Sequence, residues 1–335
     1  MKNDLRQKAG KLIKEYDMIK SGGDVVVAFS GGSDSSALLF FLVEYLNKKN
    51  NIFAAHLNHM MRSEAERDER FAVETCEKYK IKIFTGRRDI PEIAKNSKKS
   101  REEAARDERY AFLREIASSI GENVKIATAH TASDNAETVI FNLARGCGLG
   151  GLSGIAPVRG DIVRPLLSCT KEDVLKYCGQ NNISYVEDET NSDESYTRNF
   201  IRRNITSKLG EKFARADENI FKTSQLMRDF ADLTDSLTEA VIKGSDSVEA
   251  GVLIASHKAV QQAAIEKLYE NAVFPLYRKL EKKHVEYVRQ LLLDKKEKSV
   301  DLPGLVTAEI SKNMLTMKKI AGKKTSRNRK QPEKF

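Results

Sequence analysis

Residues 25–36 of this 335-residue chain are Val25-Val26-Val27-Ala28-Phe29-Ser30-Gly31-Gly32-Ser33-Asp34-Ser35-Ser36, and the apolar start of a helix follows them. The apolar run predicts a buried strand. Gly31 and Gly32 let the backbone approach an anion closely, and the positive end of the next helix faces the same place. Four hydroxyl side chains add hydrogen-bond donors: Ser30, Ser33, Ser35 and Ser36. This strand, loop and helix therefore predict a phosphate site on a nucleotide-binding sheet.

The loop has the pattern S-G-G-x-D-S, without the lysine that a Walker loop, G-x-x-x-x-G-K-[ST], requires. It resembles the pyrophosphate-binding loop of the N-type ATP pyrophosphatases. That resemblance implies that ATP is cleaved between its α and β phosphates and that an adenylate forms. It also implies that Asp34 helps to hold Mg²⁺ and that ATP contacts the loop from Ser30 to Ser35. The alternative is an ordinary Ser/Gly turn between a strand and a helix.

Short apolar runs alternate with helical patterns through the first half of the chain, which predicts a parallel sheet flanked by helices. The predicted strands are Val25–Phe29, Ile52–Leu57, Ile81–Phe84 and Val124–Ala129. The predicted helices are Ser35–Asn47, Ser63–Tyr79, Arg101–Ser119, Ser133–Ala144 and Lys171–Gln180. The basic segment Thr85–Ser100 is predicted to be a long loop, and residues 187–193 a polar turn.

The pattern becomes almost purely helical from Ser195 to Ile242, which suggests a second domain or a linking helix. Further elements are predicted at Ala259–Glu270, Lys282–Leu293, Ser299–Leu302 and Leu305–Met317, the last two as a small hairpin or sheet. The predicted fold class is α/β. A parallel-sheet, Rossmann-like N-type ATP pyrophosphatase domain (1–210) precedes a smaller, mostly helical domain with a short sheet (211–320) and a basic tail (321–335).

The positive charge of the chain is concentrated at its end. The formal net charge is +9, and residues 318–335 carry eight Lys or Arg against the single acid Glu333. A basic tail suits a polyanion such as RNA, although a solvated tail would have the same composition. No apolar run is long enough to span a membrane, so a cytoplasmic protein without membrane contact is expected. The four cysteines form no C-x-x-C pair.

Later motifs narrow the resemblance. They are His56-Leu57-Asn58-His59, Glu103-Ala104-Ala105-Arg106, His130-Thr131-Ala132-Ser133-Asp134-Asn135-Ala136-Glu137-Thr138, Arg145-Gly146-Cys147-Gly148, Arg164-Pro165-Leu166-Leu167, Asp188-Glu189-Thr190-Asn191 and Arg198-Asn199-Phe200-Ile201-Arg202. In this order they closely resemble the tRNA(Ile)-lysidine synthetases, in a short form with one C-terminal domain. The resemblance implies that free L-lysine is joined to C2 of the first anticodon cytidine of tRNA(Ile) with a CAU anticodon. It also implies that ATP becomes AMP and pyrophosphate. A homodimer is a further expectation.

The residues themselves suggest how the site is divided. Asp134 and Glu137 lie three apart on one face of a predicted helix, where they could bind or deprotonate an ammonium, or be ordinary helix acids. His56 and Asn58 end the second strand and are expected beside ATP, although His56 and His59 could also be a stray metal pair. Arg106 and Arg202 could anchor phosphate or carboxylate, or form surface ion pairs.

The resemblance completes this assignment. It places Asp34, Asp134, Glu137 and Arg106 in catalysis and gives Mg²⁺ to Asp34 and Asp134. It assigns substrate contacts to His130, Arg145, Arg198, Asn199 and Arg202.

Two positions depart from the family pattern: Ser133 replaces the first of two acids, and Cys147 stands where serine is common. Because position 133 is a serine, any role that requires both acids is left open in this chain. Two rival functions remain at this level, a tRNA thiolase of the same superfamily and a non-catalytic RNA-binding protein. Thiolases usually need paired cysteines.

Overall fold

The chain divides into two compact units, Met1–Arg228 and Asp229–Phe335. The computed structural model describes residues 4–47, 49–61, 64–186, 197–273, 280–294 and 298–320. The division falls inside helix α11 (Ala216–Ile242), and the predicted domain boundary after residue 210 precedes it. The polar turn predicted at 187–193 and the tail 321–335 lie outside the described residues.

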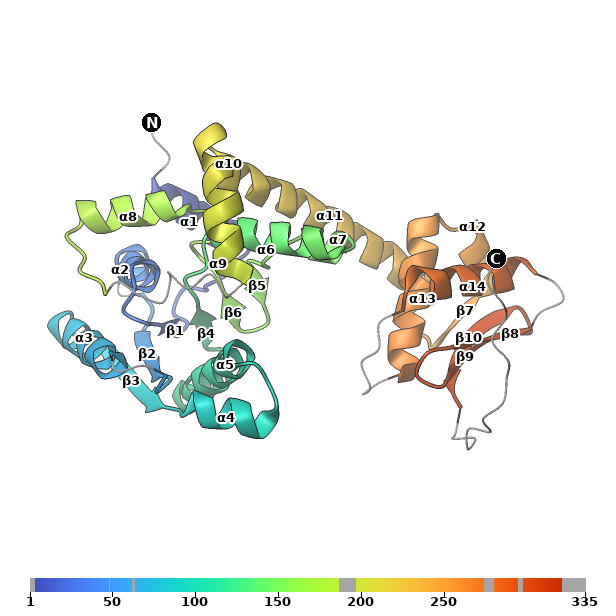
Figure 1. Ribbon diagram of the computed structural model, residues 1–335, viewed down its shortest axis with the longest axis horizontal. Helices are drawn as coiled ribbons and strands as arrows, with labels where there is room; N and C mark the ends of the chain where they lie inside the picture. Colours follow the sequence, from blue (N-terminus) through green and yellow to red (C-terminus); the bar gives the residue numbers. More distant parts are fainter. Residues whose placement is uncertain are drawn as a thin grey trace. The chain divides into compact units, whose positions relative to one another are not determined.

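The first unit is built on a six-stranded sheet with the order β3-β2-β1-β4-β6-β5 (Figure 1). Its strands are β1 (Val25–Ala28), β2 (Ile52–Asn58), β3 (Lys82–Arg87), β4 (Lys125–Ala127), β5 (Val158–Arg159) and β6 (Ile162–Val163). All neighbouring pairs are parallel except β5 with β6. The four predicted strands and the parallel sheet are confirmed.

The strand order reverses at β1, because the chain proceeds from β1 to β2 and β3 on one side and places β4 on the other. In open parallel sheets, ligands bind outside the carboxyl ends of the strands at such a switch point. The loop that follows β1 and the segment that follows β4 meet at this place.

Helices cover both faces of the sheet. They are α1 (Leu5–Glu15), α2 (Ser33–Leu46), α3 (Ala65–Lys78), α4 (Ile90–Ser97), α5 (Arg101–Ile120), α6 (Ala132–Arg145), α7 (Leu149–Leu152), α8 (Lys171–Gln180), α9 (Thr197–Ile201), the π-helical turn η2 (Arg202–Thr206) and α10 (Ser207–Lys212). The predicted helices are confirmed, and α8 has the predicted bounds. The helical pattern predicted from Ser195 is confirmed for residues 197–242.

The prediction of a long loop at Thr85–Ser100 is wrong. Strand β3 continues to Arg87, and α4 follows almost at once. The Asp89 side chain caps α4 by accepting a hydrogen bond from the Glu92 N–H at 3.0 Å, and Pro91 occupies its first turn. Both are favourable helix-start signals, which the basic composition of the segment obscured.

Two apolar cores lie on the opposite faces of the sheet. Val25 and Val27 pack into the core beneath α1, α2 and α8, whereas Val26 packs with Phe112 of α5. Alternate residues of a strand point to opposite faces, so a strand covered on both sides must be apolar throughout. This is why the run before the loop contains no polar side chain.

The second unit combines helices with an antiparallel sheet of order β7-β10-β9-β8. Its elements after α11 are β7 (Ser247–Glu249), α12 (Ala250–Ala255), α13 (Lys258–Val273), α14 (Lys282–Leu293), β8 (Ser299–Leu302), β9 (Val306–Ser311) and β10 (Met314–Lys319). The predicted sheet is confirmed, and Leu305–Met317 contributes two of its strands. Lys312 and Asn313 link them with positive φ angles of 49° and 64°, as a tight hairpin requires.

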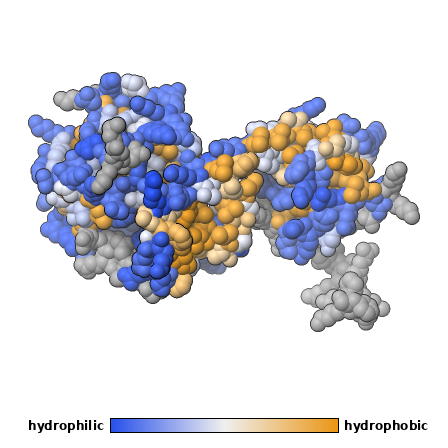
Figure 2. All heavy atoms as spheres, turned by 90° about the horizontal axis from the view of Figure 1, so that it is seen from above, coloured by the Kyte–Doolittle hydropathy of each residue, from blue (hydrophilic) through white to orange (hydrophobic). Residues whose placement is uncertain are grey.

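Figure 2 shows a largely hydrophilic surface on which apolar side chains gather in separate patches. In the part of the chain that the structure describes, every helix is too short or too polar to cross a bilayer.

Candidate active site

The loop after β1 is closed by its own hydroxyl groups. The Phe29 N–H continues the sheet by donating to the Ala55 carbonyl at 2.9 Å. Beyond it, the Ser35 hydroxyl donates to the Gly32 carbonyl at 3.0 Å and lies 3.1 Å from the Ser30 hydroxyl. These bonds fix the turn before any ligand arrives.

The glycines of this loop meet two separate requirements. Gly31 has a φ of +86°, and a Cβ there would lie 3.2 Å from Cδ1 of Phe71. Gly32 is the N-cap residue of α2 and provides no side-chain cap. The first amides of a helix have no intrahelical acceptors, and the helix dipole makes this end positive. The loop and the start of α2 therefore fit a phosphate group.

A cavity of about 600 Å³ opens at the carboxyl ends of the strands. It is lined by the β1 loop, the end of β2, helices α3 and α5, the end of β4 and the start of α6. Of the residues predicted for the site, those that line it are Ser30, Asp34, Ser35, His56, Asn58, His130 and Asp134. The volume is in the range of small-molecule and cofactor sites.

Three histidines line this cavity: His56, His59 and His130. His56 Nδ1 lies 2.9 Å from the Phe29 carbonyl oxygen, which can only accept, so Nδ1 carries the hydrogen and Nε2 is left as an acceptor. Burial lowers the pKa of His56. His130 Nδ1 lies 3.0 Å from the Thr128 hydroxyl, and burial lowers the pKa of His130 to about 4.

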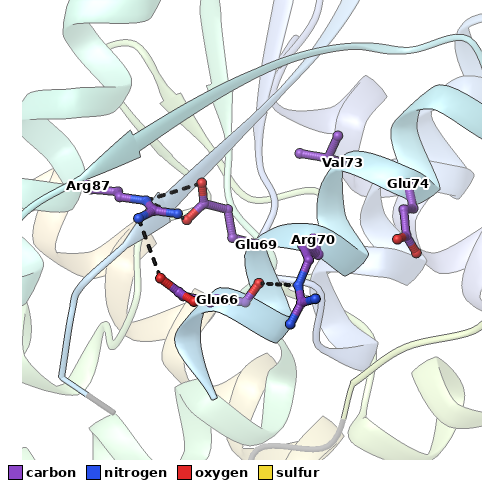
Figure 3. A pocket seen from close by; sticks show the side chains of 6 residues that line it. All are labelled: Glu66, Glu69, Arg70, Val73, Glu74 and Arg87. Carbon is purple, nitrogen blue, oxygen red and sulfur yellow. Dashed lines mark hydrogen bonds and ion pairs between the residues drawn. The ribbon is translucent and has the colours of Figure 1, made fainter. Parts of the chain in front are cut away.

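Asn58 is held by a polar cluster on the outer side of β2. Its amide donates to Glu69 Oε2 at 2.9 Å, and Glu69 also accepts from Arg87 Nε at 3.0 Å. Figure 3 shows Glu69 and Arg87 of this cluster at a second, smaller hollow of about 300 Å³, with Arg87 turned toward both Glu69 and Glu66. Since Arg87 pairs with both Glu69 and Glu66, and Glu69 also holds the Asn58 amide, we interpret this hollow as support for Asn58.

Asp134 uses its two carboxylate oxygens for different purposes. Oδ2 accepts hydrogen bonds from the Thr131 N–H and hydroxyl, each at 2.8 Å, and so caps the start of α6. Oδ1 lies 3.5 Å from Arg202 Nη2. The sequence predicts this helix start correctly to within one residue, but it does not predict the capping role.

Glu137 and Arg202 form a bidentate ion pair. Arg202 Nε lies 2.6 Å from Glu137 Oε1, and Nη2 lies 3.3 Å from Oε2. Burial raises the pKa of Glu137, and the guanidinium of Arg202 opposes that shift. The structure therefore brings together Asp134, Glu137 and Arg202, three residues selected from sequence motifs far apart in the chain.

Lys171 is a site residue that the sequence motifs did not identify. Its Nζ lies 2.7 Å from both carboxylate oxygens of Asp34 and 2.8 Å from the Ser33 hydroxyl. Burial raises the pKa of Asp34; Lys171 opposes this shift, and the nearby charge of Asp134 adds to it. The only sequence signal was the position of Lys171, shortly after the Arg164–Leu167 motif at the start of a predicted helix.

Ser133 has a definite structural role. Its hydroxyl donates to Asp217 Oδ2 at 2.5 Å and accepts from the Lys171 N–H at 3.2 Å. Ser133 therefore connects the start of α6 with the starts of α8 and α11. Asp217 places a carboxylate next to the position where the family pattern has an acid.

The predicted arginines on α5 and α6 lie at the margin of the site. Arg106 is exposed, with its guanidinium 5.9 Å from the centre of the Tyr110 ring, whereas Arg109 of the same helix lines the cavity. Arg145 is exposed at the end of α6, 5.1 Å from the centre of the Phe141 ring.

Of the two predicted residues on α9, Arg198 lies close to one cavity wall. Arg198 Nη1 is 3.8 Å from Oε1 of Glu102, a cavity-lining residue of α5. Asn199 is half-buried beside it in the sequence. One turn later, the same segment delivers Arg202 to Glu137.

The acidic residues of the site suit a nucleotide-bound Mg²⁺. Asp34 and Asp134 are close enough for the charge of one to shift the pKa of the other. Within the described ranges, no group of three or more His, Cys, Asp or Glu side chains could hold a metal ion. Mg²⁺ usually binds one or two carboxylates together with substrate phosphates and water, so a pair of aspartates beside a phosphate loop fits it.

The four cysteines are free, and three of them are buried. Burial raises the pKa of Cys76 and Cys178 to about 11 and that of Cys169 to about 12. Thiols with such values are not nucleophilic at neutral pH.

The chain resembles known proteins over most of its length. The PP-loop domain family matches residues 1–209. A tRNA(Ile)-lysidine synthase of Caldanaerobacter subterraneus is 33% identical over 329 residues, 93% of this chain and 69% of that protein. The corresponding enzyme of Thermosipho africanus is 39% identical over 235 residues, 67% of this chain and 54% of its own length. The corresponding enzyme of Pseudothermotoga lettingae is 43% identical over 213 residues, which are 63% of this chain and 47% of that protein.

The matched region thus spans about half the length of several of these relatives. Among solved structures, a U34-tRNA thiolase of Methanococcus maripaludis superposes with a TM-score of 0.56 at 19% identity, covering 67% of this chain and 78% of that one. This likeness shows a shared fold.

Proposed function

Because this chain belongs to the PP-loop family and, within it, to the tRNA(Ile)-lysidine synthases, we propose that it joins L-lysine to the first anticodon cytidine of tRNA(Ile) with a CAU anticodon. It acts as an ATP-dependent ligase that forms a carbon–nitrogen bond. The observation that carries the proposal is the cavity lined by Ser30, Asp34 and Asp134, where the phosphate loop meets the start of α6. Glu137 lies one turn further along that helix.

In the first step, O2 of the cytidine attacks the α-phosphorus of ATP, and pyrophosphate leaves into the loop at Ser30–Ser35. The unpaired amides at the start of α2 stabilise its charge. Mg²⁺ held by Asp34 and Asp134 would neutralise the phosphates during this transfer. The neutral form of His56 suits a place beside ATP, because its Nε2 can accept a hydrogen bond there.

In the second step, the lysine amine attacks C2 and AMP leaves with the oxygen that had been O2. Free lysine brings an ammonium, which must lose a proton before it attacks. Glu137 is suited to this task because burial raises its pKa, and a base works best when its pKa is near the working pH. Arg202 would have to loosen its hold on Glu137 as the ammonium arrives.

The RNA partner is proposed to meet cationic side chains around the cavity. Arg101 and Arg109 line it, and Arg198 stands next to Glu102 at the same wall. Guanidinium groups bind phosphate well and stack on bases. The cytoplasm is the proposed location, and a homodimer remains a prediction that light scattering would check.

The decisive experiment is mass spectrometry of nucleosides from tRNA incubated with the protein, ATP and isotopically labelled lysine. A cytidine that carries the label and the mass of lysine supports the proposal. Unmodified cytidine in the CAU-anticodon tRNA, with ATP turnover intact, would contradict the proposal and indicate a different acceptor.

The thiolase alternative receives little support from the cysteines. Cys76, Cys169 and Cys178 are buried with raised pKa values, and sulfur transfer needs reactive thiolates or a cysteine-bound cluster. A non-catalytic RNA-binding role would leave ATP–pyrophosphate exchange undetectable both with and without tRNA.

A further inference from the structure

Both carboxylates proposed to hold Mg²⁺ are already paired with cations of the chain. Lys171 Nζ lies 2.7 Å from each oxygen of Asp34, and Arg202 Nη2 lies 3.5 Å from Oδ1 of Asp134. The two contacts are unequal, because the ammonium is equidistant from both oxygens of Asp34 whereas Arg202 lies nearer to Glu137. Lys171 thus takes the position that a metal ion on Asp34 would need.

The base of the Lys171 side chain is firmly placed. Lys171 is the first residue of α8, and Thr170 and Asp173 close a capping box around it. The Lys171 N–H donates to Ser133, which is bonded in turn to Asp217. The side chain beyond this anchor is 46% exposed, so its ammonium can leave Asp34 without unfolding the helix.

We propose that Lys171 is a resident counterion that occupies the magnesium position on Asp34 in the nucleotide-free protein and competes with the incoming metal. In this state it offsets the repulsion between Asp34 and Asp134, two like charges in a partly buried site. When Mg²⁺ arrives with ATP, the ammonium must move away from its place between the two oxygens of Asp34, because two cations that close to one carboxylate repel each other.

This inference rests on the proposed function only in its first part, the binding of Mg²⁺ and ATP. It requires neither tRNA nor lysine. A test that omits both therefore separates the two claims: the role of Lys171 can fail while lysidine formation succeeds, and the reverse is equally observable.

The test measures how much Mg²⁺ is needed for the full-length protein to bind an ATP analogue with a methylene group between the α and β phosphates. Calorimetric titrations at increasing Mg²⁺ give a midpoint for wild type and for Lys171→Met. The variant should have a midpoint lower by about three- to fivefold, because that is the upper range expected for the loss of a partly exposed ion pair. An equal or higher midpoint would overturn the proposal, the higher value meaning that Lys171 assists nucleotide binding.

Two control variants separate the position of the charge from its presence. Lys171→Arg keeps the cation and should keep a midpoint near that of wild type. Lys176→Met removes the same charge from an exposed position of α8 and should leave the midpoint unchanged, so a matching decrease there would reduce the effect to net charge. Lys171→Gln replaces Lys171→Met if circular dichroism shows that the latter is misfolded.

A double variant tests whether the competition takes place at Asp34. Asp34→Asn alone and Asp34→Asn combined with Lys171→Met should have the same Mg²⁺ midpoint, because the contested carboxylate is absent from both. If Lys171→Met lowers the Mg²⁺ midpoint as much in the Asp34→Asn background as in the wild-type background, competition at this carboxylate is contradicted.

Discussion

Arg202 Nε lies 2.6 Å from Oε1 of Glu137, and this contact ties the π-helical turn η2 to the middle of α6. Glu137 is nearly inaccessible to solvent, with 5% of its side chain exposed, whereas Arg202 is 44% exposed. The arginine is therefore the member of the pair that can move. A carboxylate that is buried beside a movable cation is stable at rest and can still be released to a substrate.

Replacing Arg202 by Met should destabilise the protein by about 1–3 kcal/mol, because a buried carboxylate would lose its partner. Urea unfolding monitored by circular dichroism measures this. In the double variant with Glu137→Gln, much of the loss should return, since a neutral amide costs less to bury. Equal stability of the single and double variants would mean that the pair contributes little.

Glu137→Ala should impair lysine transfer more than adenylation. The side chain is placed to act on the amine, whereas the phosphate loop is built by other residues. Single-turnover assays would follow lysidine formation, and ATP–pyrophosphate exchange in the presence of tRNA would follow the first step. Comparable losses in both assays would argue against a role on the lysine side.

Gly31→Ala should weaken ATP binding and cost about 1–2 kcal/mol of stability. Its φ of +86° is unfavourable for any residue with a Cβ, and that Cβ would lie 3.2 Å from the Phe71 ring. Calorimetry with ATP and thermal unfolding test the two effects. Gly150→Ala is the matched control, because no atom lies within 4 Å of a Cβ at that position; a similar loss there would remove the special role of Gly31.

The stability of the first unit should fall on acidification through the range from about pH 6.5 to pH 4. His130 has a pKa of about 4 when folded and about 6.5 when unfolded. Between these values the unfolded chain binds the extra proton, so stability rises with pH and is complete above about 6.5. The urea midpoint of His130→Asn should vary less steeply with pH, although His56 retains a slope of the same sign. If the urea midpoints of wild type and His130→Asn vary equally with pH, His130 does not contribute to the pH dependence of stability.

Removing residues 321–335 should flatten the salt dependence of tRNA binding. The deleted segment contains six lysines and arginines and one acid, and each phosphate contact adds about 0.9 to the slope of log K against log salt for duplexes. Filter binding at several salt concentrations measures the slope. A full-length variant with these six residues replaced by Gln should behave in the same way, and an unchanged slope in either would remove the tail from RNA binding.

The fold was predictable where one strong local signal dominates. The apolar run before Ser30 predicted a strand covered on both faces, and the structure has that strand. The loop that follows it predicted an anion site. The missed helix α4 shows the limit: Asp89 and Pro91 were capping signals, but five basic residues in the segment suggested a solvated loop.

The site was predictable as a set of motifs but not as a set of contacts. Lys171 and Asp34 are 137 positions apart, and nothing in either motif encodes their distance. Arg106 and Arg109 are three positions apart on one helix, so a small difference in helical phase decides which of them faces the cavity. Which residues face the cavity or contact one another depends on packing between elements. The spacing of residues in the sequence does not determine that packing.

Asp134 carries a last consequence. One of its oxygens holds the start of α6 and the other faces Arg202, so a single side chain serves both the assembly of the helix and the charge balance of the site. A substitution of Asp134 that changes one of these functions therefore also changes the other. Among the acidic positions of the site, Asp134 should therefore tolerate substitution least, with asparagine as its mildest replacement, because an amide oxygen can still accept from the Thr131 N–H.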